Sequence, residues 1–386
     1  MIYLDHAATS FPKPERIFRE METFARECGA NPGRGAHRRS LEAQAMIEDT
    51  RRLLARLLGF PRPERIVFTL NATDALNMAI KGVLQPGAHV ISSVLEHNSV
   101  SRPLNRLAEE GLITLTRLPV SADHRLDPQD VARAFTPATR LVAVTHVSNV
   151  TGTIQPIREV GHIVRERGAL LLVDAAQSVG LVPIDMQAEA IDLLAFAGHK
   201  SLLGPTGTGG LAVGERVSIL PWREGGTGGD SSSPLHPAAF PEHLEGGTPN
   251  TLGIAGLRAG LRLLAEEGLE KRLPRERELI VRFYGAFRDP GRFRWYGSEE
   301  TLSRRRWEGR VGLVELNLPG FEPSELAAIL DERFDIAVRP GLHCAPYAHR
   351  HLGTFPQGTV RLSVGFQTTM EQMEAVSAAL EQIAAS

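Results

Sequence analysis

An amine, a carboxylate and an amide follow two short apolar segments of the chain. Residues 193–197 precede Lys200, and residues 170–173 precede Asp174 and Gln177. Both segments have the composition and length of buried strands. Ligands of open parallel α/β sheets bind at the carboxyl ends of the strands, so we expect these side chains to meet in one crevice. The set suits pyridoxal phosphate (PLP), because a lysine forms the Schiff base and an aspartate pairs with the pyridinium nitrogen.

The sequence gives less support to other roles for Lys200 and Asp174. A phosphate-binding P-loop does not fit, since His199 separates Gly198 from Lys200 and the remaining glycines of this segment follow the lysine. Burial beside PLP would lower the pKa of Lys200, which suits an amine that must lose a proton to react. Asp174 could instead cap the following helix, but a buried carboxylate needs a cationic partner, and a pyridinium N–H is one.

A candidate phosphate site follows the apolar residues 66–70. Asn71 is a favourable helix N-cap, and Ala72 and Thr73 open the expected helix. Backbone N–H groups at a helix N-terminus bind anions, so we assign Ala72 and Thr73 to the cofactor. An ordinary capped helix is the alternative.

Three further side chains come from neighbouring strand ends and loops. Gln177 and Asn149 are placed to reach the ring oxygen of the cofactor, and Asn149 ends the expected strand at 141–147. His97 follows the expected strand at 90–93, and an imidazole can stack on a pyridine ring and shuttle protons. Taken alone, a loop histidine is more often merely exposed.

The segment 339–346 carries Cys344 between glycine and proline residues, which predicts an exposed, mobile loop. A zinc site made by Cys344 and nearby histidines is an alternative, but the spacing of His343, His349 and His351 fits no familiar finger, so we predict no metal. Arg361, on the expected strand 359–363, is a candidate clamp for a substrate carboxylate. The second cysteine, Cys28, is expected to be a small apolar residue in an early helix.

Strands and helices alternate through most of the chain, which predicts an α/β fold with a mostly parallel, seven-stranded sheet covered on both faces. A glycine-rich loop at 223–236 and a mixed pattern after it predict a smaller α+β domain. We divide the chain into an N-terminal segment (1–13) that packs with the small domain, a large cofactor-binding domain (14–256) and a small C-terminal domain (257–386) that carries the Cys344 loop.

Bulk composition limits the class of protein. The 386 residues carry a net charge of −2 with both signs interspersed, so no nucleic-acid-binding surface is expected. The apolar runs are too short to cross a membrane. Two cysteines make a disulfide framework improbable and favour the reducing cytoplasm.

Several motifs in this order resemble the cysteine desulfurases of the class V aminotransferase fold, a PLP-dependent family of fold type I. The similarity is highest to the branch with a short R-x-G-x-H-C-A loop, which includes selenocysteine lyase-like members. The motifs that carry this resemblance span almost the whole chain, at residues 3–9, 31–37, 71–77, 96–97, 148–152, 173–178, 198–200, 245–250 and 339–345.

The resemblance implies a reaction and a set of roles. L-Cysteine would give L-alanine and a persulfide on Cys344, with Arg339 favouring the thiolate, and an acceptor or scaffold protein would collect the sulfur, as in iron–sulfur cluster assembly. Lys200, Asp174, His97, Gln177 and Asn149 would surround the PLP ring. In a homodimer with shared active sites, phosphate would be bound by Thr73, His199 and the partner copy's Thr248, and substrate by Arg361, Asn149, Arg339 and His37.

Two positions depart from the family pattern. Ala197 replaces a serine that supplies a phosphate hydroxyl, and Leu342 replaces the first of two histidines before the cysteine. The second departure leaves the preference between cysteine and selenocysteine open. A class V aminotransferase or β-lyase acting on another amino acid is the alternative enzyme. A non-catalytic PLP-fold scaffold is a third possibility, against which Lys200 and Asp174 argue.

Overall fold

The protein is described by a computed structural model that covers residues 1–33, 35, 37–227, 232–296 and 307–385. Two positions of the motif at 31–37, Arg34 and Ala36, lie outside the described residues, and so does part of the glycine-rich loop at 223–236.

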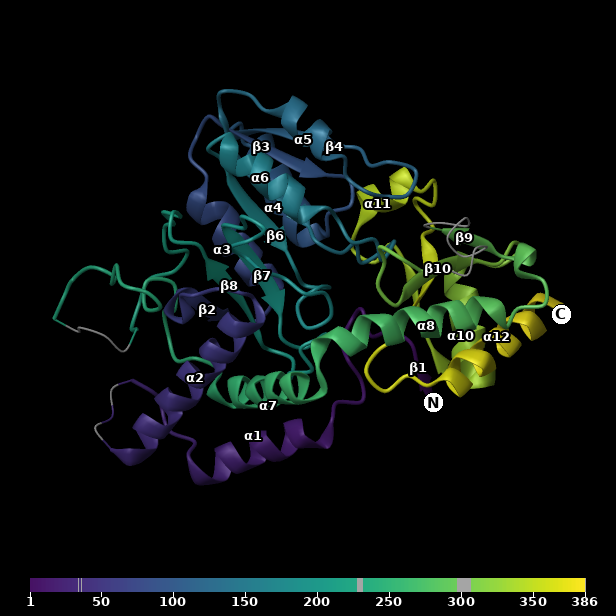
Figure 1. Cartoon of the computed structure of the whole chain (residues 1–386), viewed down its shortest axis with the longest axis horizontal. Helices are drawn as coiled ribbons and strands as arrows, with labels where there is room; N and C mark the ends of the chain where they lie inside the picture. The colour runs from purple at the N-terminus through teal and green to yellow at the C-terminus, as the bar shows by residue number, and fades with distance from the viewer. Residues whose placement is uncertain (34, 36, 228–231, 297–306, 386) are drawn as a thin grey trace.

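A large sheet forms the centre of the larger of the two parts of the molecule, beside the C-terminal part (Figure 1). Adjacent strands run parallel except that β8 is antiparallel to both of its neighbours, β2 and β7. Several of these strands are buried along their whole length, as expected for a sheet that is covered on both faces. In spatial order the seven strands are β2 (Ile66–Thr69), β8 (Gly209–Val213), β7 (Leu193–Ala197), β6 (Leu170–Asp174), β5 (Thr139–Thr145), β3 (Ala88–Ser93) and β4 (Ile113–Leu118).

Helices cover the sheet through two separate apolar cores. One core contains residues of α3 (Ala72–Val83) and α4 (Asn98–Glu109). The other core receives residues from α1 (Glu15–Glu27), α2 (Arg38–Leu57), α5 (Pro128–Ala134), α6 (Ile157–Glu166) and α7 (Thr251–Glu267). This layered arrangement confirms the predicted α/β class and the mostly parallel sheet.

The C-terminal part has its own sheet and its own apolar core. The sheet is antiparallel, in the order β12 (Arg339–Gly341), β13 (Thr359–Ser363), β10 (Leu313–Asn317) and β9 (Arg294–Tyr296). Within the described residues, the remaining helices are α8 (Arg272–Gly285), α10 (Pro323–Phe334), α11 (Pro346–His351) and α12 (Met370–Ala385), with short 3-10 turns at Pro63–Arg65, Leu269–Lys271 and Pro290–Arg292.

The first residues of the chain lie against this C-terminal part. Strand β1 (Ile2–Tyr3) pairs in parallel with β11 (Ile336–Ala337). Helix α7 crosses the predicted limit at 256 and 257, and its Leu257, Leu261 and Leu264 belong to the core of the large sheet. The domain limits therefore remain a proposal, and the packing of α7 supports a boundary just after that helix. Among the described residues, no helix has the length and apolar run needed to cross a membrane.

Candidate active site

A cavity of about 800 Å³ lies where the carboxyl ends of the large-sheet strands face β12 and β13. Its walls come from segments far apart in the sequence: the start of α3, the end of β6, the residues after β7, and the C-terminal sheet. The sequence-predicted residues that line it are Ala72, Thr73, His97, Asn149, Asp174, Gln177, His199, Lys200, Arg339 and Arg361.

Lys200 and Asp174 are brought together by two neighbouring parallel strands. Asp174 is the last residue of β6 and lies beside Ala195 of β7, and Lys200 follows β7. Burial lowers the pKa of Lys200 to about 8, although the charge of Asp174 opposes that shift. Burial also raises the pKa of Asp174, which the backbone N–H of Ala176 opposes by donating to Oδ1 at 3.0 Å. The lysine is thus an amine that gives up its proton more readily than an exposed one.

Helix N-termini fix the opposite wall of the cavity. Asn71 caps α3 by accepting a hydrogen bond from the N–H of Asp74. His97 caps α4 in the same way, with Nδ1 accepting from the N–H of Ser99 at 3.1 Å. Because Nδ1 accepts, the ring proton of His97 lies on Nε2. Burial and the charge of Lys200 lower the pKa of His97 to about 4, so the ring is neutral at pH 7.

The side-chain amides of Gln177 and Asn149, both predicted site residues, each donate a hydrogen bond to a segment that borders the cavity. Gln177 Nε2 donates to the carbonyl of Ala7 at 2.8 Å, which ties the N-terminal segment to the wall. Asn149 Nδ2 donates to the carbonyl of His343 at 2.7 Å, which ties down the loop that carries Cys344. His199 contacts Thr9 Oγ1 through Nδ1 at 3.1 Å.

Arg361 is a buried cation at the edge of the cavity, with 1% of its surface exposed. Its Nη2 pairs with Asp5 Oδ1 at 2.7 Å, and its Nη1 donates to the carbonyl of Asn149 at 3.0 Å. Its Nε, also buried, has no hydrogen-bond partner in the structure. A guanidinium held in this way retains N–H groups that can bind a carboxylate.

Cys344 is exposed and lies next to the cavity rather than in its lining. Its Sγ is 3.9 Å from Arg339 Nη2, and its carbonyl accepts a hydrogen bond from the N–H of Asn98 at 2.7 Å. His343 and Cys344 both have left-handed backbone conformations, with φ of 50° and 58°. Such conformations carry strain in non-glycine residues and persist only where the surroundings enforce them. The predicted mobile loop is therefore tied to the large domain at several points.

Three residues named in the sequence analysis do not line this cavity: the predicted site residues His37 and Thr248, and the second cysteine, Cys28. His37 caps α2, where its Nδ1 accepts from the N–H of Ser40. Thr248 lines a different hollow together with Leu70 and Pro249. Cys28 packs against the large core as expected. Within the described part of the chain, no group of three or more histidine, cysteine, aspartate or glutamate side chains is arranged to hold a metal ion.

Sequence reasoning missed three residues that shape the site. Ser99 Oγ lies 2.7 Å from Thr73 Oγ1 and so links the two helix N-termini. Asp5 was noted only as part of a motif, yet it pairs with Arg361. Glu315 is fully buried, with Oε2 3.7 Å from Nε2 of His343 in the Cys344 loop. Its local sequence does not mark it as a site residue.

The donor set fits PLP. The cavity offers a buried amine of lowered pKa, a buried carboxylate, two capped helix N-termini and a neutral imidazole. A pyridinium N–H can bind the carboxylate, and helix N-termini can bind a phosphate. Ala197 lines the same cavity, so the hydroxyl expected from the family pattern is missing at that position.

The fold and this cavity define an enzyme of the class V aminotransferase type. The family model "Aminotransferase class-V" matches residues 2–376, and the chain belongs to this family. A probable cysteine desulfurase from Methanothermobacter thermautotrophicus is 34% identical over 99% of this chain and 94% of its own length. An apo cysteine desulfurase structure from Thermococcus onnurineus superimposes with a TM-score of 0.91 at 33% identity, covering 100% of this chain and 94% of that one. A cysteine desulfurase structure from Escherichia coli has a TM-score of 0.87 at 30% identity, covering 98% and 94%.

Proposed function

We propose that this protein is a PLP-dependent cysteine desulfurase, which converts L-cysteine to L-alanine and leaves the sulfur as a persulfide on Cys344. The observation that carries the proposal is the docking of the Cys344 loop beside a cavity that contains Lys200 and Asp174. The relatives named above support the same activity.

In this proposal each cavity residue has a role in binding the cofactor or in moving a proton. When bound, PLP supplies an electron sink for chemistry at the substrate α-carbon. Lys200 binds the cofactor and then moves a proton at that carbon, a task suited to its lowered pKa. Asp174 would accept the pyridinium N–H, and His97 would stack on the ring. Asn149 and Gln177 would bind the ring oxygen, and Ala72, Thr73 and His199 would bind the phosphate.

The sulfur step belongs to the small C-terminal part. Arg361 and Arg339 hold the substrate carboxylate at the cavity edge. Cys344 Sγ attacks the substrate sulfur, so that an S–S bond forms, the substrate C–S bond breaks, and the carbon skeleton takes a proton and leaves as alanine. An acceptor or scaffold protein that collects the persulfide, as in iron–sulfur cluster assembly, completes the cycle. A thiol reductant would release the sulfur as sulfide.

The location of Thr248 supports a homodimer with shared active sites. Thr248 lies in a separate hollow beside Leu70, whose surface is 54% exposed, so in this proposal it serves the phosphate of a second copy of the chain. His37 likewise serves substrate in the partner. The cytoplasmic location rests on the two free cysteines and remains part of the proposal.

The test is to measure alanine and persulfide after mixing the PLP-loaded protein with L-cysteine. We expect equal amounts of alanine and of added sulfur on Cys344 in a single turnover, with the sulfur found by mass spectrometry. Cys344→Ala should abolish alanine formation from L-cysteine but retain selenocysteine cleavage, because selenium can leave without a thiol. Alanine formation from L-cysteine that survives this substitution would refute the persulfide route. A requirement for an amino acceptor would indicate the aminotransferase alternative.

A further inference from the structure

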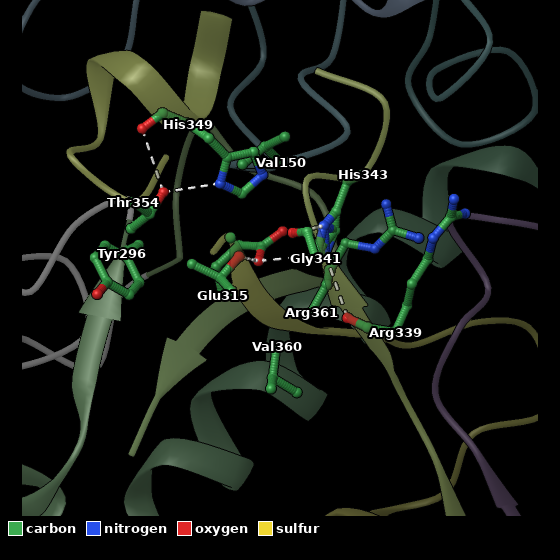
Figure 2. Close-up of polar contacts among 12 residues, drawn as sticks. Val150, Tyr296, Glu315, Arg339, Gly341, His343, His349, Thr354, Val360 and Arg361 are labelled. Carbon is green, nitrogen blue, oxygen red and sulfur yellow. Dashed lines mark hydrogen bonds and ion pairs between the residues drawn. The ribbon is translucent and has the colours of Figure 1, made fainter. Parts of the chain in front are cut away.

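A cluster of buried polar side chains lies beneath the Cys344 loop and has no role in the scheme above. Glu315 on β10 and His343 in the loop are both buried, with side chains 0% exposed, and Glu315 Oε2 is 3.7 Å from His343 Nε2. Thr359 Oγ1, on the neighbouring strand, donates to the same carboxyl oxygen. Figure 2 shows Glu315 and His343 side by side, with Arg361 and Arg339 next to them.

His343 in turn holds the backbone that leads to the nucleophile. Its Nδ1 lies 2.9 Å from the carbonyl of Gly341, and its Nε2 lies 3.3 Å from the carbonyl of Arg339. Both ring nitrogens therefore face backbone oxygens of the segment just before Cys344. A neutral imidazole has one N–H and can serve only one of these oxygens, so its tautomer matters.

We propose, resting on the function proposed above, that Glu315 is a positioning residue that acts through His343 to hold the Cys344 loop in its reactive conformation. The strain in the loop gives this role a physical reason. Two consecutive left-handed residues, His343 and Cys344, need external contacts to persist. Glu315 supplies a polar contact from a rigid strand to the first of them.

Charge is not what Glu315 contributes. Burial raises the pKa of Glu315 to about 8, and burial together with Arg361 lowers the pKa of His343. Both shifts favour the neutral forms near pH 7, with the proton on the carboxyl group of Glu315. A neutral carboxyl group and a glutamine amide have similar shapes, and each has one carbonyl oxygen and a donor. Glutamine should substitute for Glu315, whereas leucine, of similar size but apolar, should not.

The first measurement needs neither substrate nor turnover. In a Cys28→Ser background Cys344 is the single thiol of the chain, and its rate of alkylation by iodoacetamide reports the loop conformation. We expect Glu315→Leu to change that rate about fivefold or more, because the polar contact to His343 is lost, and Glu315→Gln to stay within about twofold, because an amide keeps that contact. Asp192→Asn is the control, because Asp192 is an equally buried carboxylate that pairs with Arg216 at the other end of β7. It should lower the melting temperature and leave alkylation unchanged.

The second measurement uses the PLP-loaded protein. Glu315→Leu should slow persulfide formation on Cys344 about tenfold while the first absorbance change on adding L-cysteine keeps its rate, because only the loop is displaced. Glu315→Leu leaves the buried Thr359 hydroxyl without its acceptor, so this variant should melt lower than the parent. Asp192→Asn should also melt lower but keep the parent rate of persulfide formation, so a slow step in Glu315→Leu alone shows positioning rather than loss of stability.

Each outcome decides the inference. Alkylation and persulfide rates of Glu315→Leu that equal those of the parent overturn it, and so does a Glu315→Gln variant as impaired as Glu315→Leu. If Glu315→Leu does not fold, Thr359→Val removes the hydroxyl that orients Glu315 and should shift both rates at least about twofold. No shift in that variant also overturns the inference. If the parent makes neither alanine nor persulfide, the proposed function fails, and the alkylation rates still decide the role of Glu315.

Discussion

The backbone N–H of Asn98 donates a 2.7 Å hydrogen bond to the carbonyl of Cys344, which joins the first turn of α4 to the loop of the proposed nucleophile. Asn98 directly follows His97, whose ring lines the cofactor cavity. One turn of backbone therefore positions both His97, the residue proposed to stack on the cofactor ring, and the loop that carries Cys344. Movement of this turn would change the distance between the cofactor and the thiol.

Asn98→Pro tests that bond with little damage to the helix. Asn98 is the first helical residue, where proline is favoured, and His97 has the extended backbone (φ −62°, ψ 155°) that a following proline requires. Removing the N–H should slow persulfide formation on Cys344 about fivefold, the usual effect of one lost hydrogen bond. Asn98→Ala keeps the N–H and should behave like the parent, and equal rates for the two variants would show that the bond has no role.

The lowered pKa of Lys200 predicts how PLP binding depends on pH. The neutral amine reacts, and with a pKa of about 8 roughly a tenth of Lys200 is neutral at pH 7, against far less for an ordinary lysine. The rate at which the cofactor-free protein gains the absorbance of bound PLP should rise with pH and level off above about pH 8. A rate that keeps rising to about pH 10 would mean that Lys200 is not buried. The Lys200→Ala variant should not gain the absorbance of covalently bound PLP at any pH.

Arg361→Lys should weaken substrate binding despite keeping the charge. The guanidinium of Arg361 serves Asp5 and the carbonyl of Asn149 at once, which one ammonium group cannot match in geometry. We expect the KM for L-cysteine to rise about tenfold, with a smaller change in kcat. Arg350→Lys is the matched control, because Arg350 is an exposed arginine of α11 that stacks on Phe355. An equal rise in KM in both variants would show that Arg361 has no specific role in substrate binding.

The strand pattern alone predicted that Lys200 and Asp174 would meet in one crevice, and the structure brings both side chains to one cavity. Lys200 and Asp174 each follow a fully apolar segment, and parallel strands bring their carboxyl ends to one edge, so the crevice was predictable without any pairing information. Strand β4 was missed, although the predicted number of strands was right. Its Thr114 and Thr116 alternate with apolar residues and it lies at the sheet edge, so it lacks a continuous apolar run.

Glu315 shows why the rest of the site was hidden. Its importance comes from two relationships: Glu315 lies opposite Arg361 in an antiparallel strand pair, and it contacts His343 in a loop that comes later in the chain. Neither relationship follows from local sequence. Thr248 and His37 were assigned from family resemblance, and a single chain does not bring them to its own cavity.

A buried glutamate at the junction of the two parts predicts how stability depends on pH. Glu276 of α8 accepts a hydrogen bond from the N–H of Gly312, and burial raises its pKa to about 7, although Arg272 opposes the shift. The folded protein thus binds this proton more tightly than the unfolded chain, whose glutamates titrate near 4.5. The stability that this proton contributes is present in full below that value and is lost as the pH rises through about 7.

Glu276→Gln removes this titration. Between about pH 5 and about pH 8, the stability of the parent relative to the Gln variant should fall by about 3 kcal/mol, measured by urea unfolding at each pH. Glu278→Gln, on the exposed face of the same helix, should leave the pH profile of the parent unchanged. Parallel profiles for the parent and Glu276→Gln would mean that Glu276 is ionised throughout this range, and that its charge is balanced by Arg272 despite the burial of both side chains.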